Sequence, residues 1–339
     1  MPLHTGLDLH KHFSTVAVMN DDGEIERVDK LYHDDRARLR EFFSAYAGKA
    51  VVIVEATRNW YWLYELLEEL GLRVKLANAR KVRLIAESQL QNDKVAPRDL
   101  AQLERTNFLP EAYIPPREVR DNREYLRYRL TLVRLRTGLK NKVHAQLDKL
   151  GIAHPFTDLF CPAGRRFLSQ LTLRPVYQEE LTNYLALIED IERRIVAATK
   201  EIKQQLKPDP RTELLMTIPG IGHLTAYLLL NEIGDVRRFP TPGKLCAYGG
   251  LVPIVKQSAE HRWQGHLTSD GNHYIRWALA ESACKAPSKD YQFGTFYRRL
   301  AARRGPLKAR MALARKLLVI VWHVLTNGEP YKVKEIPTV

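Results

Sequence analysis

The stretch that decides the fold of the N-terminal region is AVVIVE, residues 50–55, a continuous apolar run that ends in a carboxylate. Short runs rich in Val and Ile are typical of strands buried on both faces of a sheet. Further strands are expected at 3–9, 14–19, 24–32 and 72–77, and NDDG at 20–23 is a good hairpin turn. Helices are expected at 34–47, 60–70, 80–87 and 98–107. This alternation predicts an α/β domain with a mixed sheet.

The chain changes character after Pro110, and Pro115-Pro116 is typical of a linker end. Residues 117–149 carry ten Lys or Arg against four acids, which predicts a long basic helix. A second helix, 178–206, has a heptad seam at Tyr184, Ile188, Ile191, Ile195, Ala198 and Ile202. This seam fits either the core of a helical hairpin within one chain or a dimerising coiled coil. We therefore predict three domains: 1–112, a helical coiled-coil region at 113–208, and a mostly α-helical domain at 209–339.

The composition favours a polyanionic partner. The 339 residues carry a formal charge of +14, and eight Lys or Arg with no acid lie between Arg298 and Lys316. Nucleic acid is the commonest partner of such a chain, and a merely soluble basic protein is the alternative. Three scattered cysteines, no apolar signal core and no apolar run long enough for a bilayer favour a cytoplasmic protein without a membrane partner.

Four acids form the first candidate site. Asp8 lies within the apolar strand 3–9, and Glu55 ends the strand 50–55. A carboxylate in an apolar strand costs free energy unless it has a partner, and adjacent parallel strands would bring both acids to one edge of the sheet. Asp93 and Asp99 flank the start of the next helix. Converging carboxylates bind hard cations such as Mg²⁺, although each acid could also be a turn or helix-start residue.

Two segments of the C-terminal region are candidates for binding nucleic acid. IPGIGHLT at 218–225 resembles the hairpin of a helix–hairpin–helix element, in which Gly220 and Gly222 would let backbone amides approach a phosphate. The alternative is a tight interhelical turn.

Downstream, Ser258 has Lys256, His261, Arg262 and Arg276 as neighbours that could bind a phosphate. A serine in a polar loop is usually only a hydrogen-bonding residue, and these residues alone do not single it out as a nucleophile.

These motifs, taken in order, resemble the DEDD-motif insertion-sequence transposases with a RuvC-like domain, described as bridge-RNA-guided recombinases. The resemblance covers nearly the whole chain. It rests on GLD at 6–8, VEAT at 54–57, NDKV at 92–95, IPGIG at 218–222, RF at 238–239, YGGLVP at 248–253, GN at 271–272 with IR at 275–276, and ARKL at 314–317.

The resemblance implies an RNase-H-like (RuvC-like) first domain whose acids hold Mg²⁺, and a helical domain with a serine nucleophile. By its position after the Gly-Leu-Val-Pro segment that serine is Ser258, although the usual following glycine is Ala259 here. The family pattern also has an acid three residues after Asp93, where this chain has Ala96. Natural loss, deliberate replacement, or a shift that recruits Asp99 would explain it. Asp99 is a poor substitute because it lies about 240° from Asp93 around an ideal helix.

The resemblance further implies a structured guide RNA that pairs with donor and target DNA while the protein binds shape and backbone. We therefore expect an RNA-guided, Mg²⁺-dependent DNA recombinase in which Asp8, Glu55, Asp93 and Ser258 are catalytic. The acids and the serine lie in different predicted domains, which favours a dimer or tetramer. The alternatives are a metal-only nuclease or junction resolvase, and a nucleic-acid-binding derivative impaired by Ala96.

Overall fold

The computed structural model describes residues 2–57, 59–86, 96–258, 261–268 and 270–333. The chain forms two compact units, Met1–Pro115 and Pro116–Val339. The boundary falls within the Pro115-Pro116 linker end. Of the region 113–208, which we predicted as separate, residues 116–208 share the second unit with the C-terminal helices.

The first unit is built on a mixed six-stranded sheet with the order β3-β2-β1-β4-β5-β6. Its strands are β1 (Leu3–Leu9), β2 (Phe13–Met19), β3 (Ile25–Tyr32), β4 (Ala50–Glu55), β5 (Arg73–Ala77) and β6 (Glu111–Ala112). The pairs β1–β2 and β2–β3 are antiparallel, the pairs β1–β4 and β4–β5 are parallel, and β6 pairs antiparallel with β5. The five predicted strands form as expected, and only the short β6 was not predicted. The mixed sheet is compatible with the RNase-H-like fold that the resemblance implies.

Helices cover both faces of this sheet because the central strands are apolar on both sides. Helices α1 (Arg36–Ser44) and α2 (Trp60–Glu69) bury one core with Leu7 and Val54. Helices α3 (Ala79–Ala86) and α4 (Ala96–Arg105) cover the other face, where Leu100 packs with Ile53. The continuous apolar run in β4 is therefore explained by burial on both faces.

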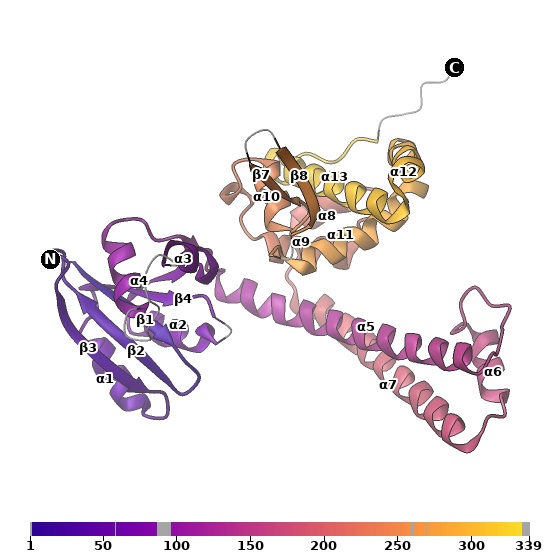
Figure 1. The fold of residues 1–339 in the computed structure, drawn as a ribbon, viewed down its shortest axis with the longest axis horizontal. Helices are drawn as coiled ribbons and strands as arrows, with labels where there is room; N and C mark the ends of the chain where they lie inside the picture. Colours follow the sequence, from indigo (N-terminus) through magenta and orange to yellow (C-terminus); the bar gives the residue numbers. More distant parts are fainter. Residues whose placement is uncertain (1, 58, 87–95, 259–260, 269, 334–339) are drawn as a thin grey trace. The chain divides into compact units, whose positions relative to one another are not determined.

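The second unit begins with two long helices that run side by side, α5 (Arg117–Lys149) and α7 (Pro175–Gln205), joined through α6 (Pro162–Gln170) (Figure 1). Contacts at both ends show that they are antiparallel: Gln146 bonds to the carbonyl of Tyr177, and Lys207 pairs with Glu118 at 3.2 Å. The α7 residues buried in the chain follow one another at intervals of seven: Leu181, Ile188, Ile195 and Ile202. Ile188, Ile195 and Ile202 of the predicted seam therefore belong to the core stripe of a hairpin within one chain, whereas Tyr184, Ile191 and Ala198 are only partly buried in it.

The rest of the second unit is a helical core with one β-hairpin. Its elements are α8 (Pro210–Met216), α9 (His223–Ile233), α10 (Pro242–Tyr248), α11 (His273–Lys285), α12 (Tyr291–Arg304) and α13 (Pro306–Asn327), with β7 (Pro253–Ser258) paired to β8 (His261–Leu267). Helix α9 is buried along most of its length, and α5 and α7 contribute Leu126, Leu130 and Ile202 to the same core. The hairpin is the one departure from the predominantly helical domain that we predicted. None of the helices in the described ranges is both long and apolar enough to cross a bilayer.

Candidate active site

Asp8 and Glu55 lie side by side on neighbouring strands. The parallel register of β1 and β4 pairs Leu7 with Val54, and the two acids follow these residues directly. In a parallel pair, residues opposite each other belong to the same face of the sheet, so both acids lie on the face covered by α4. Both are partly buried. The expectation that adjacent parallel strands bring these carboxylates to one edge is therefore confirmed.

Gly6 explains how α4 approaches this edge. A Cβ atom at Gly6 would lie 1.8 Å from the carbonyl oxygen of Pro97 and 2.8 Å from the amide nitrogen of Ala101. At the other end of the helix, Arg105 bonds to the carbonyl of Asp21 in the β2–β3 turn, beside the first residues of β1. Helix α4 therefore runs antiparallel to β1, and its N-terminal end lies toward Asp8.

The last two acids are placed less completely. Asp93 lies outside the described residues, and Ala96 is the first residue of α4. Asp99 lies in the first turn, but it is about 200° around the helix from Pro97, the residue that contacts Gly6. Burial raises the pKa of Asp99 above its usual value. Asp99 therefore lies on the side of α4 away from Pro97, and its role as a metal ligand stays a prediction.

His10 is a contact of the site that the sequence analysis passed over. Its Nε2 lies 3.2 Å from Asp8 Oδ2, and the Asn59 side chain donates to the His10 carbonyl at 3.1 Å. Asp8 and His10 are two residues apart at the end of β1, a spacing that puts residues on one face of a strand. This spacing was the signal available in the sequence. The contact places the His10 ring beside the Asp8 carboxylate at the end of the strand.

The described residues supply part of a metal site. They include no group of three or more His, Cys, Asp and Glu side chains arranged to hold a metal ion. Asp8 and Glu55 contribute two carboxylates from rigid strands, which is the donor type that hard divalent cations prefer. The donor set therefore fits such a cation, and Asp93, the third predicted ligand, lies outside the described residues.

Ser258 is the last residue of β7, at the tip of the β-hairpin. The backbone register pairs Ser258 with His261, Gln257 with Arg262 and Lys256 with Trp263. Alternation assigns positions 256, 258, 261 and 263 to one face of the hairpin and 257 and 262 to the other. Lys256 and His261 therefore share the face of Ser258, whereas Arg262 belongs to the opposite face. The side chains of 255–264 lie outside the described part of the structure.

Arg276 supports the base of this hairpin. Its Nη2 donates to the carbonyl of Thr268 at 2.6 Å, directly after β8. A Cβ atom at Gly250 would lie 2.0 Å from the same Nη2, and one at Gly271 would lie 2.0 Å from the Gly250 Cα. The glycines let two chain segments and one guanidinium pack at van der Waals distance. Arg276, proposed from the sequence as a phosphate ligand, thus has a structural contact in this fold.

The two glycines of the IPGIG segment differ in their surroundings. Gly220 has a φ of +92°, and a Cβ there would lie 2.6 Å from the carbonyl oxygen of Ser282 in α11. Gly222 is the N-cap of α9, where no side chain caps the helix, and a Cβ there would meet nothing within 4 Å. Gly220 therefore serves close packing, whereas Gly222 leaves the start of α9 open.

A buried ionic network holds α5 against α9 and α11. The fully buried Glu232 accepts from Arg127 at 2.8 and 2.9 Å, and from Asn272 at 2.7 Å. Asn272 also caps α11 by accepting from the amides of residues 274 and 275. Glu232 was not among the residues predicted from the sequence, because a single acid in an apolar helix does not indicate which distant cation it will pair with.

Comparisons with known proteins match both units. The model of DEDD transposases of the IS110 type matches residues 5–152, and that of the Transposase IS116/IS110/IS902 family matches residues 212–298. The chain is 24% identical over 325 residues to the transposase for insertion sequence element IS1111A of Coxiella burnetii, covering 91% of this chain and 87% of the relative. It is 28% identical over 318 residues to the transposase for insertion sequence element IS1328 of Yersinia enterocolitica, covering 86% and 88%. It is 35% identical over 126 residues to the pilin gene-inverting protein of Moraxella bovis, covering 36% and 38%.

Proposed function

The chain belongs to the IS110 family of DEDD transposases, which are DNA recombinases, and from that premise we propose that it cuts and rejoins DNA through Ser258 with a divalent metal held by its acids. The observation that carries the proposal is the parallel register that brings Asp8 beside Glu55. Two ionised carboxylates on one edge of a buried sheet repel each other, and a shared cation offsets that cost.

In this proposal Asp8, Glu55 and Asp93 hold Mg²⁺. When bound, the metal would supply positive charge that polarises a DNA phosphate and stabilises the leaving oxygen. His10 positions the Asp8 carboxylate, and Gly6 lets the first turn of α4 approach the same edge. Asp99 is the weaker candidate for a ligand because it lies about 200° around α4 from Pro97, the residue beside Gly6.

Ser258 is the proposed nucleophile. Its hydroxyl oxygen forms an ester bond to the phosphorus, the bond from phosphorus to a DNA ribose oxygen breaks, and the serine proton ends on that oxygen. Rejoining reverses the step with the hydroxyl of a second strand, so no external energy source is needed. Lys256, which shares the hairpin face of Ser258, would neutralise phosphate charge, and Arg262 on the other face would contact the backbone.

The proposed partners are donor DNA, target DNA and a structured guide RNA, with two or four copies of the chain in the active assembly. The charge of +14 supports a nucleic-acid partner. The name of the Moraxella bovis relative, a pilin gene-inverting protein, supports chemistry that both cuts and rejoins. RNA guidance rests on the family resemblance, and sequencing the RNA that co-purifies with the chain tests it: a random mixture of cellular RNA contradicts a dedicated guide.

Removal of the Ser258 hydroxyl tests the mechanism. Wild-type protein incubated with its DNA substrate and Mg²⁺ should give a protein–DNA band on a denaturing gel, and Ser258→Ala should abolish both this adduct and strand exchange. Ser169→Ala, in α6, is the matched control and should retain both. Full cleavage by Ser258→Ala, with no adduct in the wild type, would show that water attacks and would support the metal-only nuclease instead.

The alternative of an impaired derivative rests on Ala96, which stands where the family pattern has an acid. Ala96→Asp should increase Mg²⁺-dependent strand exchange, because a third or fourth carboxylate strengthens metal binding at the edge that holds Asp8 and Glu55. Strand exchange that is absent in the wild type and is not restored by Ala96→Asp would favour the non-catalytic alternative.

A further inference from the structure

We propose that a basic pocket enclosed by α5, α7, α9 and α11 binds a phosphodiester group of the nucleic-acid backbone. This inference rests on the proposed function, because it assumes that the chain acts on nucleic acid. The pocket has a volume of about 540 Å³ and lies within the second unit. Four cations line it against a single acid, Glu281: Arg129, Arg136, Lys203 and Lys285. We call it the phosphate pocket.

Two arginines of α5 face this pocket without a strong anionic partner. Arg129 and Arg136 are seven residues apart, so they lie on one side of the helix. Burial lowers the pKa of Arg129, and the positive charge of Arg136 lowers it further. Two half-buried guanidinium groups that repel each other are stabilised when an anion lies between them. A phosphate is the anion whose geometry suits two such donors.

The hydrogen bonds of these arginines leave donors available. Arg129 Nε donates to Thr199 Oγ1 at 2.7 Å, which orients its guanidinium plane. Arg136 Nε is buried and has no hydrogen-bond partner among the described residues. Its Nη1 lies 4.0 Å from Glu192 Oε1, at the limit of an ion pair. The pocket therefore holds an oriented cation beside a second cation that is only weakly paired, and an anion bound there would offset the repulsion between them.

The start of α9 opens into the same pocket. Gly222, His223, Leu224 and Thr225 all line it, and no side chain caps the helix there. The first amides of a helix lack internal acceptors and carry partial positive charge, so they bind phosphate oxygens. Cations and helix amides thus converge from separate elements. Trp277 adds an aromatic wall that a sugar or base can contact.

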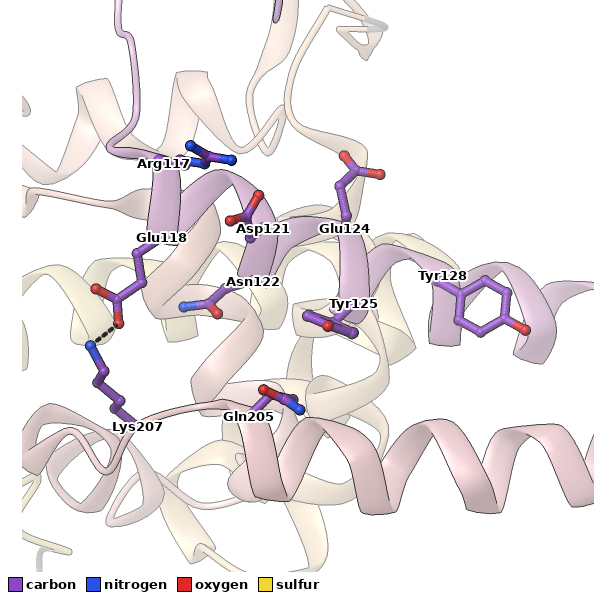
Figure 2. A pocket seen from close by; sticks show the side chains of 9 residues that line it. All are labelled: Arg117, Glu118, Asp121, Asn122, Glu124, Tyr125, Tyr128, Gln205 and Lys207. Atoms are coloured by element: carbon purple, nitrogen blue, oxygen red, sulfur yellow. Dashed lines mark ion pairs between the residues drawn. The ribbon is translucent and has the colours of Figure 1, made fainter. Parts of the chain in front are cut away.

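A second pocket in the same unit shows the contrast. The pocket between the start of α5 and the end of α7, about 880 Å³, is lined by three acids, Glu118, Asp121 and Glu124, and by only two cations, Arg117 and Lys207 (Figure 2). Its Lys207 is already paired with Glu118. A cavity with this charge would repel a phosphate, so the cation-rich lining of the phosphate pocket is not a general property of the α5–α7 hairpin.

Paired substitutions test the phosphate pocket. Arg129→Gln/Arg136→Gln removes two charges from it, and Arg193→Gln/Arg237→Gln removes two from exposed surface ion pairs as a matched control. Binding of the full chain to a DNA duplex and to an RNA duplex is measured by fluorescence anisotropy over a range of salt concentrations. The pocket variant should bind roughly tenfold more weakly and reduce the salt slope by about 1, as expected for one lost phosphate contact.

Loss on DNA alone, on RNA alone or on both supports the proposal and identifies the source of the phosphate. Wild-type affinity and salt slope for both duplexes, or an equal loss in the control, would overturn it.

A substitution at Gly222 separates binding from folding. Gly222→Asp caps α9, which should leave the free energy of unfolding unchanged or slightly higher, but it also introduces a carboxylate into the pocket. Gly222→Asp should therefore weaken binding about tenfold, whereas the uncharged cap in Gly222→Ser should weaken it less. Wild-type binding by Gly222→Asp contradicts the proposal.

Duplex binding and strand exchange by the wild type distinguish failure of this proposal from failure of the proposed function. A wild type that binds duplexes but exchanges no strands contradicts the proposed function and leaves the pocket test readable. A wild type that exchanges strands, with pocket variants that bind normally, contradicts the pocket alone.

Discussion

Gly6→Ala should destabilise the first unit more than any ordinary glycine substitution. The new Cβ would lie 1.8 Å from the Pro97 carbonyl oxygen, and all three atoms that it meets within 2.8 Å are backbone atoms of α4. Backbone cannot rotate away as a side chain does. The N-terminal end of α4 must therefore retreat from β1 by about 1.6 Å to reach the 3.4 Å at which ordinary contact begins.

This retreat opens the core between α4 and the sheet. Leu100 and Ala101 are buried there with exposures of 3% and 0%, and each loses contacts when the helix moves. Overpacking by a methyl group typically costs about 1–3 kcal/mol, and a clash with backbone belongs at the upper end, so we expect about 3 kcal/mol. The end of α4 that lies toward Asp8 also moves, so metal-dependent strand exchange should fall further than the loss of folded protein explains.

Hydrogen exchange of the full chain, followed by mass spectrometry of peptides from β1 and β4, measures the local free energy of unfolding of this unit. Gly71→Ala is the control in the same unit, because its φ is +73° but a Cβ there meets nothing within 4 Å. The control should cost only about 1 kcal/mol, from the left-handed backbone. A Gly6→Ala variant no less stable than Gly71→Ala would refute the close approach of α4 to β1.

Two further substitutions test the electrostatics. Glu232→Gln should lower the free energy of unfolding, measured by urea denaturation, by about 3 kcal/mol, because it leaves Arg127 and Arg123 without their buried anion. A loss no larger than that of the surface variant Asp190→Asn would contradict this prediction. Asp99→Asn should stabilise the chain at pH 7, because burial raises the pKa of this carboxyl and its charged form is therefore unfavourable. That advantage should vanish as the pH falls through the folded-state pKa of Asp99, and a loss of metal-dependent strand exchange at neutral pH would instead show that Asp99 is a metal ligand.

Local patterns in the sequence predict most of the elements. Apolar runs and turn residues place the strands at 3–9 and 50–55 at the positions where they form, since burial on both faces requires continuous apolar residues. The heptad spacing of α7 likewise predicts a buried stripe. It does not predict the partner, because a seam packs equally well against the same chain or another, and the structure shows that α5 covers it.

Some features of the candidate sites could likewise be predicted from the sequence, and others could not. Gly6-Leu7-Asp8 and the terminal Glu55 identify an acidic edge from sequence, because parallel strands carry their last residues to one side. The contact of His10 with Asp8 could have been predicted, because residues two positions apart lie on the same face of a strand. The sequence did not predict that Arg129 and Arg136 line one pocket with Gly222, since Gly222 is about ninety positions further along the chain.

The sequence by itself determined the order of strands and helices, the basic character of the chain, the acidic pair and the family motifs, because each depends on nearby residues or on composition. Only the tertiary structure decided that Gly6 admits α4, that Glu232 neutralises the arginines of α5, and that the start of α9 meets those cations in a pocket. The physical reason is the separation along the chain of the residues that interact. Periodicity acts between neighbours in the chain, whereas close packing and charge pairing depend on distances that exist only after the chain has folded.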